Sequence, residues 1–236
     1  MLAYVDTKNK LLKYINHENL KAGDQLPSEN KLSEMLGISR LTLREAVNAL
    51  KNEGVVYSVQ GKGTFVACNT DQIADTLNNN LSVTEMIESS GYEAGVKFFK
   101  KELVRAEAEI AERLGVNEGA NLIMCARIRT ADGKPVVYSE DYLAPRLVEE
   151  FLAVTDENVS LYKFIENQAG IEMGLSIAEI VPVKADGELA KMLETKPDDV
   201  LQKFMITVND VYGTPLVYAR EYMRPDSFKF LIHRWR

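Results

Sequence analysis

The sequence predicts two domains: an N-terminal winged helix-turn-helix, mainly α-helical with a β wing, and a C-terminal α+β domain built on an antiparallel sheet. Residues 26–66 read as helix, short turn, helix and hairpin, and the later half contains one unit twice. The 236 residues, 46% of them hydrophobic, suffice for two cores. We expect the N-terminal domain at residues 1–68, a linker at 69–80 and the second domain at 81–236.

Charge is distributed unevenly along the chain. The net charge is −7, yet residues 1–68 hold nine Lys/Arg against seven Asp/Glu, and the remainder holds nineteen against twenty-eight. Nucleic-acid phosphates repel a strongly acidic surface. Nucleic-acid binding is therefore expected from the N-terminal domain alone.

Several classes of protein are not indicated. The cysteines Cys68 and Cys125 and the histidines His17 and His233 have no spacing typical of a zinc or iron–sulfur site, so no metal and no cofactor is expected. The sequence shows neither a signal peptide nor an apolar run of the roughly 20 residues that span a membrane. We expect a cytoplasmic protein with no membrane partner.

A first helix is expected from about Asp6 to His17, where leucine and isoleucine recur at helical spacing. In the second helix Ser28 is the expected N-cap, and Gly37 suits the left-handed position that ends a helix. Ser39 caps the next helix only two residues later. That distance permits only a sharp turn.

The third helix is expected from Ser39 to Asn52. Arg40 and Arg44 lie one turn apart near its N-terminus, beside a buried stripe formed by Leu43, Ala46, Val47 and Leu50. On an arbitrary helix two such arginines are usually solvated surface charges. After a sharp turn of this kind, they occupy the end of a recognition helix that enters the major groove.

A β-hairpin with a basic tip follows. Residues 55–59 and 64–66 are β-prone, and Gly61-Lys62-Gly63 lies between them. The small tip would let Lys62 approach phosphates or a minor groove, although an ordinary hairpin turn that contains a lysine is the alternative. It is not a nucleotide-binding loop, because the upstream glycine and the following helix are missing.

Three ordered blocks resemble the DNA-binding domain of GntR-family bacterial transcription regulators: LPSEN at 26–30, GISRLTLREA at 37–46 and GKGTFV at 61–66. The resemblance implies that residues of the third helix read or clamp the operator and that the hairpin makes the wing contact. Many members carry Arg where this chain has Asn30. The DNA-binding residues expected are Ser28, Asn30, Ser39, Arg40, Thr42, Arg44, Gly61, Lys62, Gly63 and Thr64.

The second domain contains an internal repeat. Residues 104–111 align with 183–190, and with one inserted residue Gly133 and Pro135 fall on Gly213 and Pro215. Each copy reads as strand end, short helix, strand, turn and strand, which predicts an antiparallel sheet with helices packed on one face. The alternative is chance similarity, because turns reuse glycine and proline.

Two arginines distinguish the first copy. Arg127 and Arg129 are two apart on a predicted strand, so they share a face, and we align them with Thr207 and Asn209. Paired arginines suit phosphate or carboxylate, and a helix capped by Ser160 offers free N–H groups to an anion. Alternatively, the arginines are surface charges and Ser160 is only a cap.

The run ARIRTADGKP at 126–135, followed by SLY at 160–162, resembles the UTRA effector domain of the HutC subfamily within the GntR family. The resemblance implies a chorismate-lyase-like fold, a homodimer, and a small anionic effector, such as a sugar phosphate. It implies effector binding by Arg127, Arg129, Ser160 and Tyr162, with Glu140 as a further contact.

The leading hypothesis is an effector-responsive repressor that binds a palindromic operator in double-stranded DNA. An enzyme is the first alternative, since the resembling fold also serves a lyase, but no catalytic constellation is evident. An architectural DNA binder without an effector is the second. The sequence does not identify the effector.

Overall fold

The computed structural model describes residues 3–18, 20–52, 54–67, 73–77 and 80–231. The chain forms two compact units: the first comprises residues 1–79, 85–92 and 226–236, and the second comprises residues 80–84 and 93–225. Among the described residues, no helix is long and apolar enough to cross a membrane.

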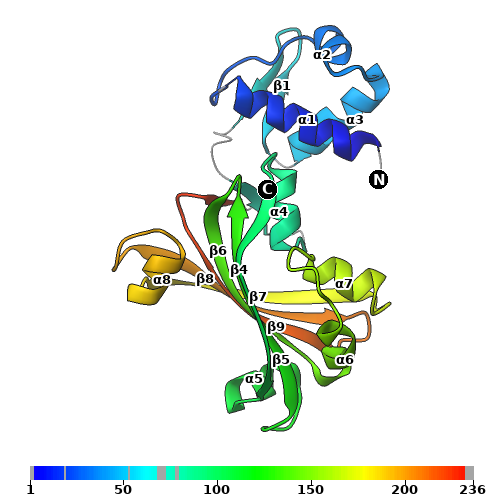
Figure 1. The fold of residues 1–236 in the computed structure, drawn as a ribbon. Coiled ribbons are helices and arrows are strands. Elements are labelled where there is room, and N and C mark those ends of the chain that lie inside the picture. The colour runs from blue at the N-terminus through cyan, green and yellow to red at the C-terminus, as the bar shows by residue number, and fades with distance from the viewer. Residues whose placement is uncertain (1–2, 19, 53, 68–72, 78–79, 232–236) are drawn as a thin grey trace, which may run out of the picture. The chain divides into compact units, whose positions relative to one another are not determined.

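The first unit contains the predicted helix-turn-helix and hairpin (Figure 1). Helix α1 begins three residues earlier than expected. The elements are α1 (Ala3–His17), α2 (Glu29–Leu36), α3 (Arg40–Asn52), β1 (Val56–Val59) and β2 (Gly63–Val66). Their core includes the predicted stripe of α3 and joins it to α1 through Leu11, Leu12 and Ile15, all buried.

The turn between α2 and α3 forms as the sequence predicts. Ser28 accepts a hydrogen bond from the Lys31 N–H at the start of α2. Gly37 ends this helix at φ 65°, a conformation that favours glycine, and Ser39 accepts the Thr42 N–H at 3.1 Å. The two caps fix where one helix stops and the next begins.

The segment expected to be a linker contains a strand. Residues 73–76 form β3 (Ile73–Thr76), which pairs in parallel with β10 (Phe228–Leu231), so the end of the chain returns to the first unit. Residues 69–72 and 78–79 of that segment lie outside the described residues. Helix α4 (Val83–Ser89) follows.

The second unit is built on a six-stranded antiparallel sheet in the order β4-β5-β6-β9-β8-β7 (Figure 1). This confirms the predicted fold class. Its strands are β4 (Ala94–Arg105), β5 (Asn121–Ala131), β6 (Lys134–Leu143), β7 (Met173–Lys184), β8 (Val200–Asp210) and β9 (Pro215–Met223). Its helices are α5 (Ala108–Leu114), the 3-10 turn η1 (Pro145–Leu147), α6 (Val148–Leu152), α7 (Leu161–Asn167) and α8 (Gly187–Met192).

The internal repeat is present in the structure: β4-α5-β5-β6 corresponds to β7-α8-β8-β9. The alignment of the arginines was wrong. The ladder irregularity after Arg129 in β5 matches the one after Val208 in β8, so the extra residue lies in the later turn. The counterparts of Arg127 and Arg129 are therefore Ile206 and Val208.

The prediction of helices on a single face was also wrong. Helices α6 and α7 pack on the face that carries Ile123 and Cys125 of β5. Helices α5 and α8 pack on the other face, against neighbours such as Leu122 and Ala126. Alternate residues of β5 are buried on both sides, because strand side chains alternate between faces. We call the two sides the α6/α7 face and the α5/α8 face.

Candidate functional site

The N-terminus of α3 presents the residues predicted to contact DNA. Arg40 and Arg44 are exposed, while Ser39 and Thr42 are joined through their hydroxyls at 2.8 Å. Ser28 and Asn30 are exposed at the start of α2. A capped helix start with exposed guanidinium groups suits insertion into the major groove, where arginine reads guanine and the helix end favours phosphate.

Arg44 is tied to the neighbouring helix. Its Nε donates to Glu29 Oε2 at 2.7 Å, and both side chains are well exposed. An exposed ion pair contributes little to stability. The pair instead restricts the directions in which Arg44 points, and it links the start of α2 to the start of α3.

The wing is held by the segment before α2. Gln25 Nε2 donates to the Lys62 carbonyl at 2.6 Å, while the Lys62 side chain is exposed. Gly63 has φ 124°, a backbone conformation that favours glycine, and a Cβ there would lie 2.6 Å from the side-chain end of Gln25. Ser58 and Thr64 join their hydroxyls across the hairpin at 2.9 Å. The hairpin tip is thus a turn with a defined backbone conformation, in which Gly61 also has a positive φ.

Leu41 was missed by the sequence reasoning. It lies between Arg40 and Thr42 and is 70% exposed, although it is a large apolar residue. At the start of a recognition helix, such a side chain suits contact with a thymine methyl group. The sequence could have indicated this exposure, because Leu41 lies outside the helical spacing of the buried residues of α3.

In the second unit, Arg127 and Arg129 share the α6/α7 face of the sheet, and both are buried. Arg127 donates to the Val159 carbonyl and to Asp141, each at 2.9 Å. Arg129 donates to the Thr84 hydroxyl at the start of α4. Because burying a charge is costly unless it is paired, these positions are not ordinary surface arginines.

The start of α7 lies in the same group. Ser160 caps α7 and donates to the Ser82 hydroxyl at 3.3 Å; both serines are buried. The residue before it, Val159, supplies the carbonyl that Arg127 contacts. Tyr162 lies one residue into α7, and its hydroxyl donates to Asn80 at 3.3 Å. The structure therefore brings Arg127 and Ser160 together, as predicted.

Two acidic residues of this face were missed. Asp141 pairs with Arg127 and accepts from the Ser139 hydroxyl at 3.2 Å. Glu221 of β9 lies directly across from Ser139, is 8% exposed, and its Oε2 has no hydrogen-bond partner among the described residues. Burial, together with the Asp141 charge, raises the pKa of Glu221 to about 8. The internal repeat could have indicated both residues, since it aligns Glu221 with Asp141 and so places an acid at the same position of each copy.

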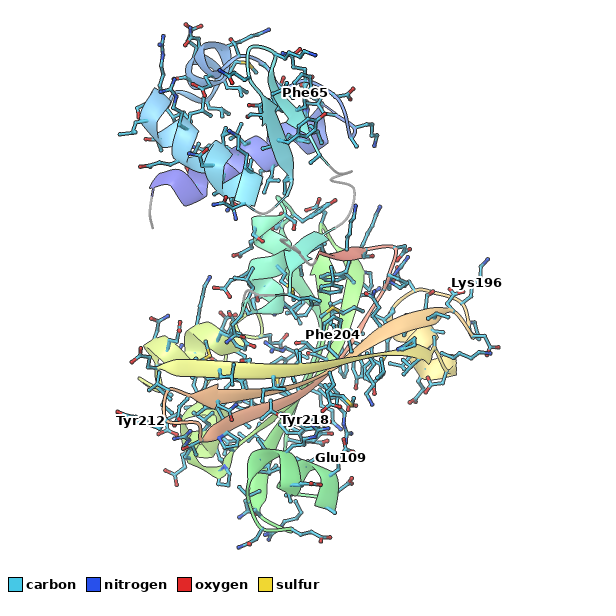
Figure 2. All side chains as sticks on the ribbon, turned by 180° about the vertical axis from the view of Figure 1, so that it is seen from behind. Phe65, Glu109, Lys196, Phe204, Tyr212 and Tyr218 are labelled. Atoms are coloured by element: carbon cyan, nitrogen blue, oxygen red, sulfur yellow. The ribbon has the colours of Figure 1, made fainter. Side chains whose placement is uncertain are left out.

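Glu140 lies on the other side of the sheet from this group, and its role as an effector contact stays a prediction. It lies one residue from Ser139 and from Asp141, and strand alternation therefore places it on the α5/α8 face. There it accepts from the Tyr138 hydroxyl at 3.0 Å, and its carboxylate lies 3.9 Å from Arg220. Figure 2 labels Tyr218, a buried tyrosine of the same face.

Other reactive groups offer little chemistry. No group of three or more His, Cys, Asp or Glu side chains in the described part of the chain is placed to hold a metal. Burial raises the pKa of the Cys125 thiol to about 11, so the thiol stays protonated near neutral pH. The arrangement is suited to binding an anion.

Comparison with protein families matches residues 3–66 to the bacterial regulatory proteins of the gntR family and residues 89–229 to the UTRA domain. The chain is 28% identical to the HTH-type transcriptional repressor NagR of Bacillus subtilis (strain 168), over 97% of this chain and 93% of that protein. It is 24% identical to the mannosyl-D-glycerate transport/metabolism system repressor MngR of Escherichia coli (strain K12), over 97% and 94%.

The crystal structure of PhnF from Mycobacterium smegmatis has a similar fold. The TM-score is 0.61 at 24% identity, and the match covers 97% of this chain and 99% of that chain. At this identity the likeness concerns the fold alone. It extends over both units of the chain.

Proposed function

Because the chain belongs to the GntR family of bacterial regulatory proteins, with the UTRA domain of its HutC subfamily, we propose that it is a homodimeric repressor controlled by a sugar phosphate. In this proposal the effector binds at the arginine group of the second unit and changes the affinity for a palindromic operator. The protein acts in the cytoplasm, where bacterial DNA lies.

Regulation of transcription itself is the family's activity: the first module binds DNA and the UTRA domain binds a small-molecule effector. The chain is therefore a regulator, and the enzyme alternative is not favoured. An architectural role without an effector would leave the UTRA domain without a task.

The observation that carries the effector proposal is the grouping of two buried arginines beside the capped start of α7. Arg127 and Arg129 share one face of the sheet, and Arg127 contacts the carbonyl of the residue before Ser160. Planar guanidinium groups donate to phosphate or carboxylate in pairs of hydrogen bonds, so this group favours an anion.

The remaining polar atoms of the group favour a phosphate that is attached to a hydroxyl-bearing group such as a sugar. The α7 start and the Ser160 and Thr84 hydroxyls can donate to phosphate oxygens. Glu221 Oε2 and Gln202 Oε1, which lack hydrogen-bond partners among the described residues, face the same side and can bind sugar hydroxyls. The relative MngR is named for a mannosyl-D-glycerate system, which is also sugar-derived.

The DNA half of the proposal follows from the two-fold symmetry of a dimer. Each wing and recognition helix takes one half-site, about one helical turn from the other. An effector that binds one dimer geometry more tightly than another shifts the population of the DNA-competent form. Release of DNA on effector binding is the direction that we propose.

The DNA half is tested with operator DNA selected from a random pool by the parent protein. In gel-shift titrations, we expect Arg44→Ala to weaken binding at least about tenfold, the range expected for one base-reading arginine. Lys51→Ala, at the opposite end of α3, serves as the matched control and should stay close to the parent. Equal binding by Arg44→Ala and the parent would remove the proposed recognition helix.

The effector half is tested by thermal-shift titration with glucose 6-phosphate, glucosamine 6-phosphate, the free sugars and inorganic phosphate. We expect a sugar phosphate to raise the melting temperature of the parent and to weaken operator binding. Arg129→Ala should lose the shift, whereas Arg113→Ala, on the α5/α8 face, should retain it. An equal shift in Arg129→Ala would contradict the proposed site.

A further inference from the structure

The outward side of α3 has an apolar residue at its centre. Leu41 lies in the first turn of the helix and is 70% exposed, more than any other large apolar side chain in the described part of the first unit. It lies nine residues before Leu50, which is about two and a half helical turns. Because Leu50 is fully buried, Leu41 lies on the side of α3 directly opposite the core.

The neighbours of Leu41 on this side are charged. Arg40 precedes it directly, and Arg44 and Glu45 lie one turn further along α3, all of them exposed. A single exposed apolar residue is common on protein surfaces and needs no explanation by itself. Leu41 differs because it lies between two arginines, in the first turn of the proposed recognition helix.

The backbone around Leu41 is fixed by local contacts. Ser39 accepts the Thr42 N–H at 3.1 Å, and the hydroxyls of these two residues are joined at 2.8 Å. Leu43 is fully buried and anchors the same turn in the core. The first turn of α3 therefore has its conformation before DNA is bound, so little ordering is required when Leu41 enters an interface.

The floor of the major groove offers one apolar group to such a side chain. The base edges present hydrogen-bond donors and acceptors there, and thymine adds the methyl group at its C5 position. A methylated cytosine carries the same group at the same carbon. A leucine that enters the groove therefore gains most opposite a C5-methyl pyrimidine, because both apolar surfaces are then removed from water.

We infer that Leu41 is a specificity-determining residue that reads the C5-methyl group of one pyrimidine in each half-site, thymine in the operator. This inference rests on the DNA half of the proposed function and names a chemical group within the operator. The neighbouring arginines contact phosphate or read guanine, so they do not recognise a methyl group.

The test removes the methyl group from the DNA without changing its hydrogen bonds. In the operator selected by the parent protein, each thymine is replaced in turn by uracil, which pairs with adenine in the same way. At one position of each half-site, we expect the affinity in gel-shift titrations to fall about fourfold per methyl group removed, the effect of exposing one buried methyl group.

Cytosine and 5-methylcytosine at the same position, each paired with guanine, provide a second comparison. The operator with 5-methylcytosine should bind about fourfold more tightly than the operator with cytosine. A protein that recognised only the hydrogen-bond pattern of thymine would bind these two operators equally.

Protein variants assign the methyl effect to Leu41. Leu41→Ala should lose it in both comparisons, whereas Leu41→Met keeps an apolar side chain of similar size and should retain most of it. Arg44→Ala, which weakens operator binding, should still distinguish thymine from uracil. Because Leu41 is exposed, both substitutions at this position should leave the melting temperature of the free protein close to that of the parent.

The outcomes separate this inference from the proposed function. Equal binding of the thymine and uracil operators at every position, or a methyl effect that persists in Leu41→Ala, overturns the role of Leu41. The proposed recognition helix stands after either result if Arg44→Ala weakens operator binding. A parent protein that selects no operator from the random pool overturns both proposals.

Discussion

The two copies of the repeat share one backbone plan and differ in what their inner strands bury. On the α6/α7 face, the first copy pairs Arg127 with Asp141 at 2.9 Å. The second copy retains the acid, as Glu221, but has Ile206 in place of the arginine. Burial and the Asp141 charge raise the pKa of Glu221 to about 8, although Arg127 and Arg129 act in the opposite direction.

The difference shows how two copies of one fold come to carry different polar groups. The packing of the helices and the strand registers can stay the same, because they depend on apolar alternation, while a few inward-facing residues change. In our proposal, the two buried arginines of the first copy bind the effector. The comparison can be tested by substituting equivalent positions, beginning with the largest effect.

Removing the arginine of the first copy should have the largest effect. Arg127→Met leaves Asp141, 4% exposed, without its cation, and an orphaned buried charge costs about 3–5 kcal/mol. Ile206→Met, at the equivalent position, keeps volume and polarity and should cost less than about 1.5 kcal/mol. Urea unfolding followed by circular dichroism measures both.

A double variant provides the control. Arg127→Met with Asp141→Asn removes the orphaned charge as well, so it should recover part of the lost stability. If the single variant unfolds at the same urea concentration as Ile206→Met, then the ion pair is not the feature that distinguishes the copies.

The second effect concerns pH. Because burial raises the pKa of Glu221 from 4.5 to about 8, the folded chain holds a proton there that the unfolded chain has released. Its contribution to stability is full below pH 4.5 and is lost as pH rises towards 8, at up to about 1.4 kcal/mol per pH unit.

Glu221→Gln removes this titration. Between pH 6 and 8 its melting temperature should decline less than that of the parent, and it should exceed the parent at the alkaline end. Parallel melting curves for the two proteins across this range would show that Glu221 is ionised in the folded state.

The smallest effect is expected where both copies have exposed charges at equivalent positions. Glu179 of β7 pairs with Arg113, and Lys100 of β4 pairs with Glu102, at 2.6 and 2.8 Å. Exposed pairs contribute less than about 1 kcal/mol. Glu179→Gln and Lys100→Gln should each shift the urea midpoint only slightly, and a larger loss in either would mean that the edge charges also hold the helices in place.

Local signals explain why the first unit was predictable. Ser28, Gly37 and Ser39 act within three or four residues of their own position, so capping and turn geometry follow from the sequence. The pairing of β3 with β10 was not predictable in this way, because it joins residues about 155 positions apart.

In the second unit, the sequence alone determined the repeat, the antiparallel strands and the shared face of Arg127 and Arg129, since these depend on alternation and turns. The tertiary structure decided which acids join them. A step of one residue along a strand changes the face of the sheet, which places Asp141 beside Arg127 and Glu140 on the opposite face. Glu221 lies opposite Ser139 only because β9 pairs with β6. These strands are about 80 residues apart, and no local sequence pattern predicts such a pairing.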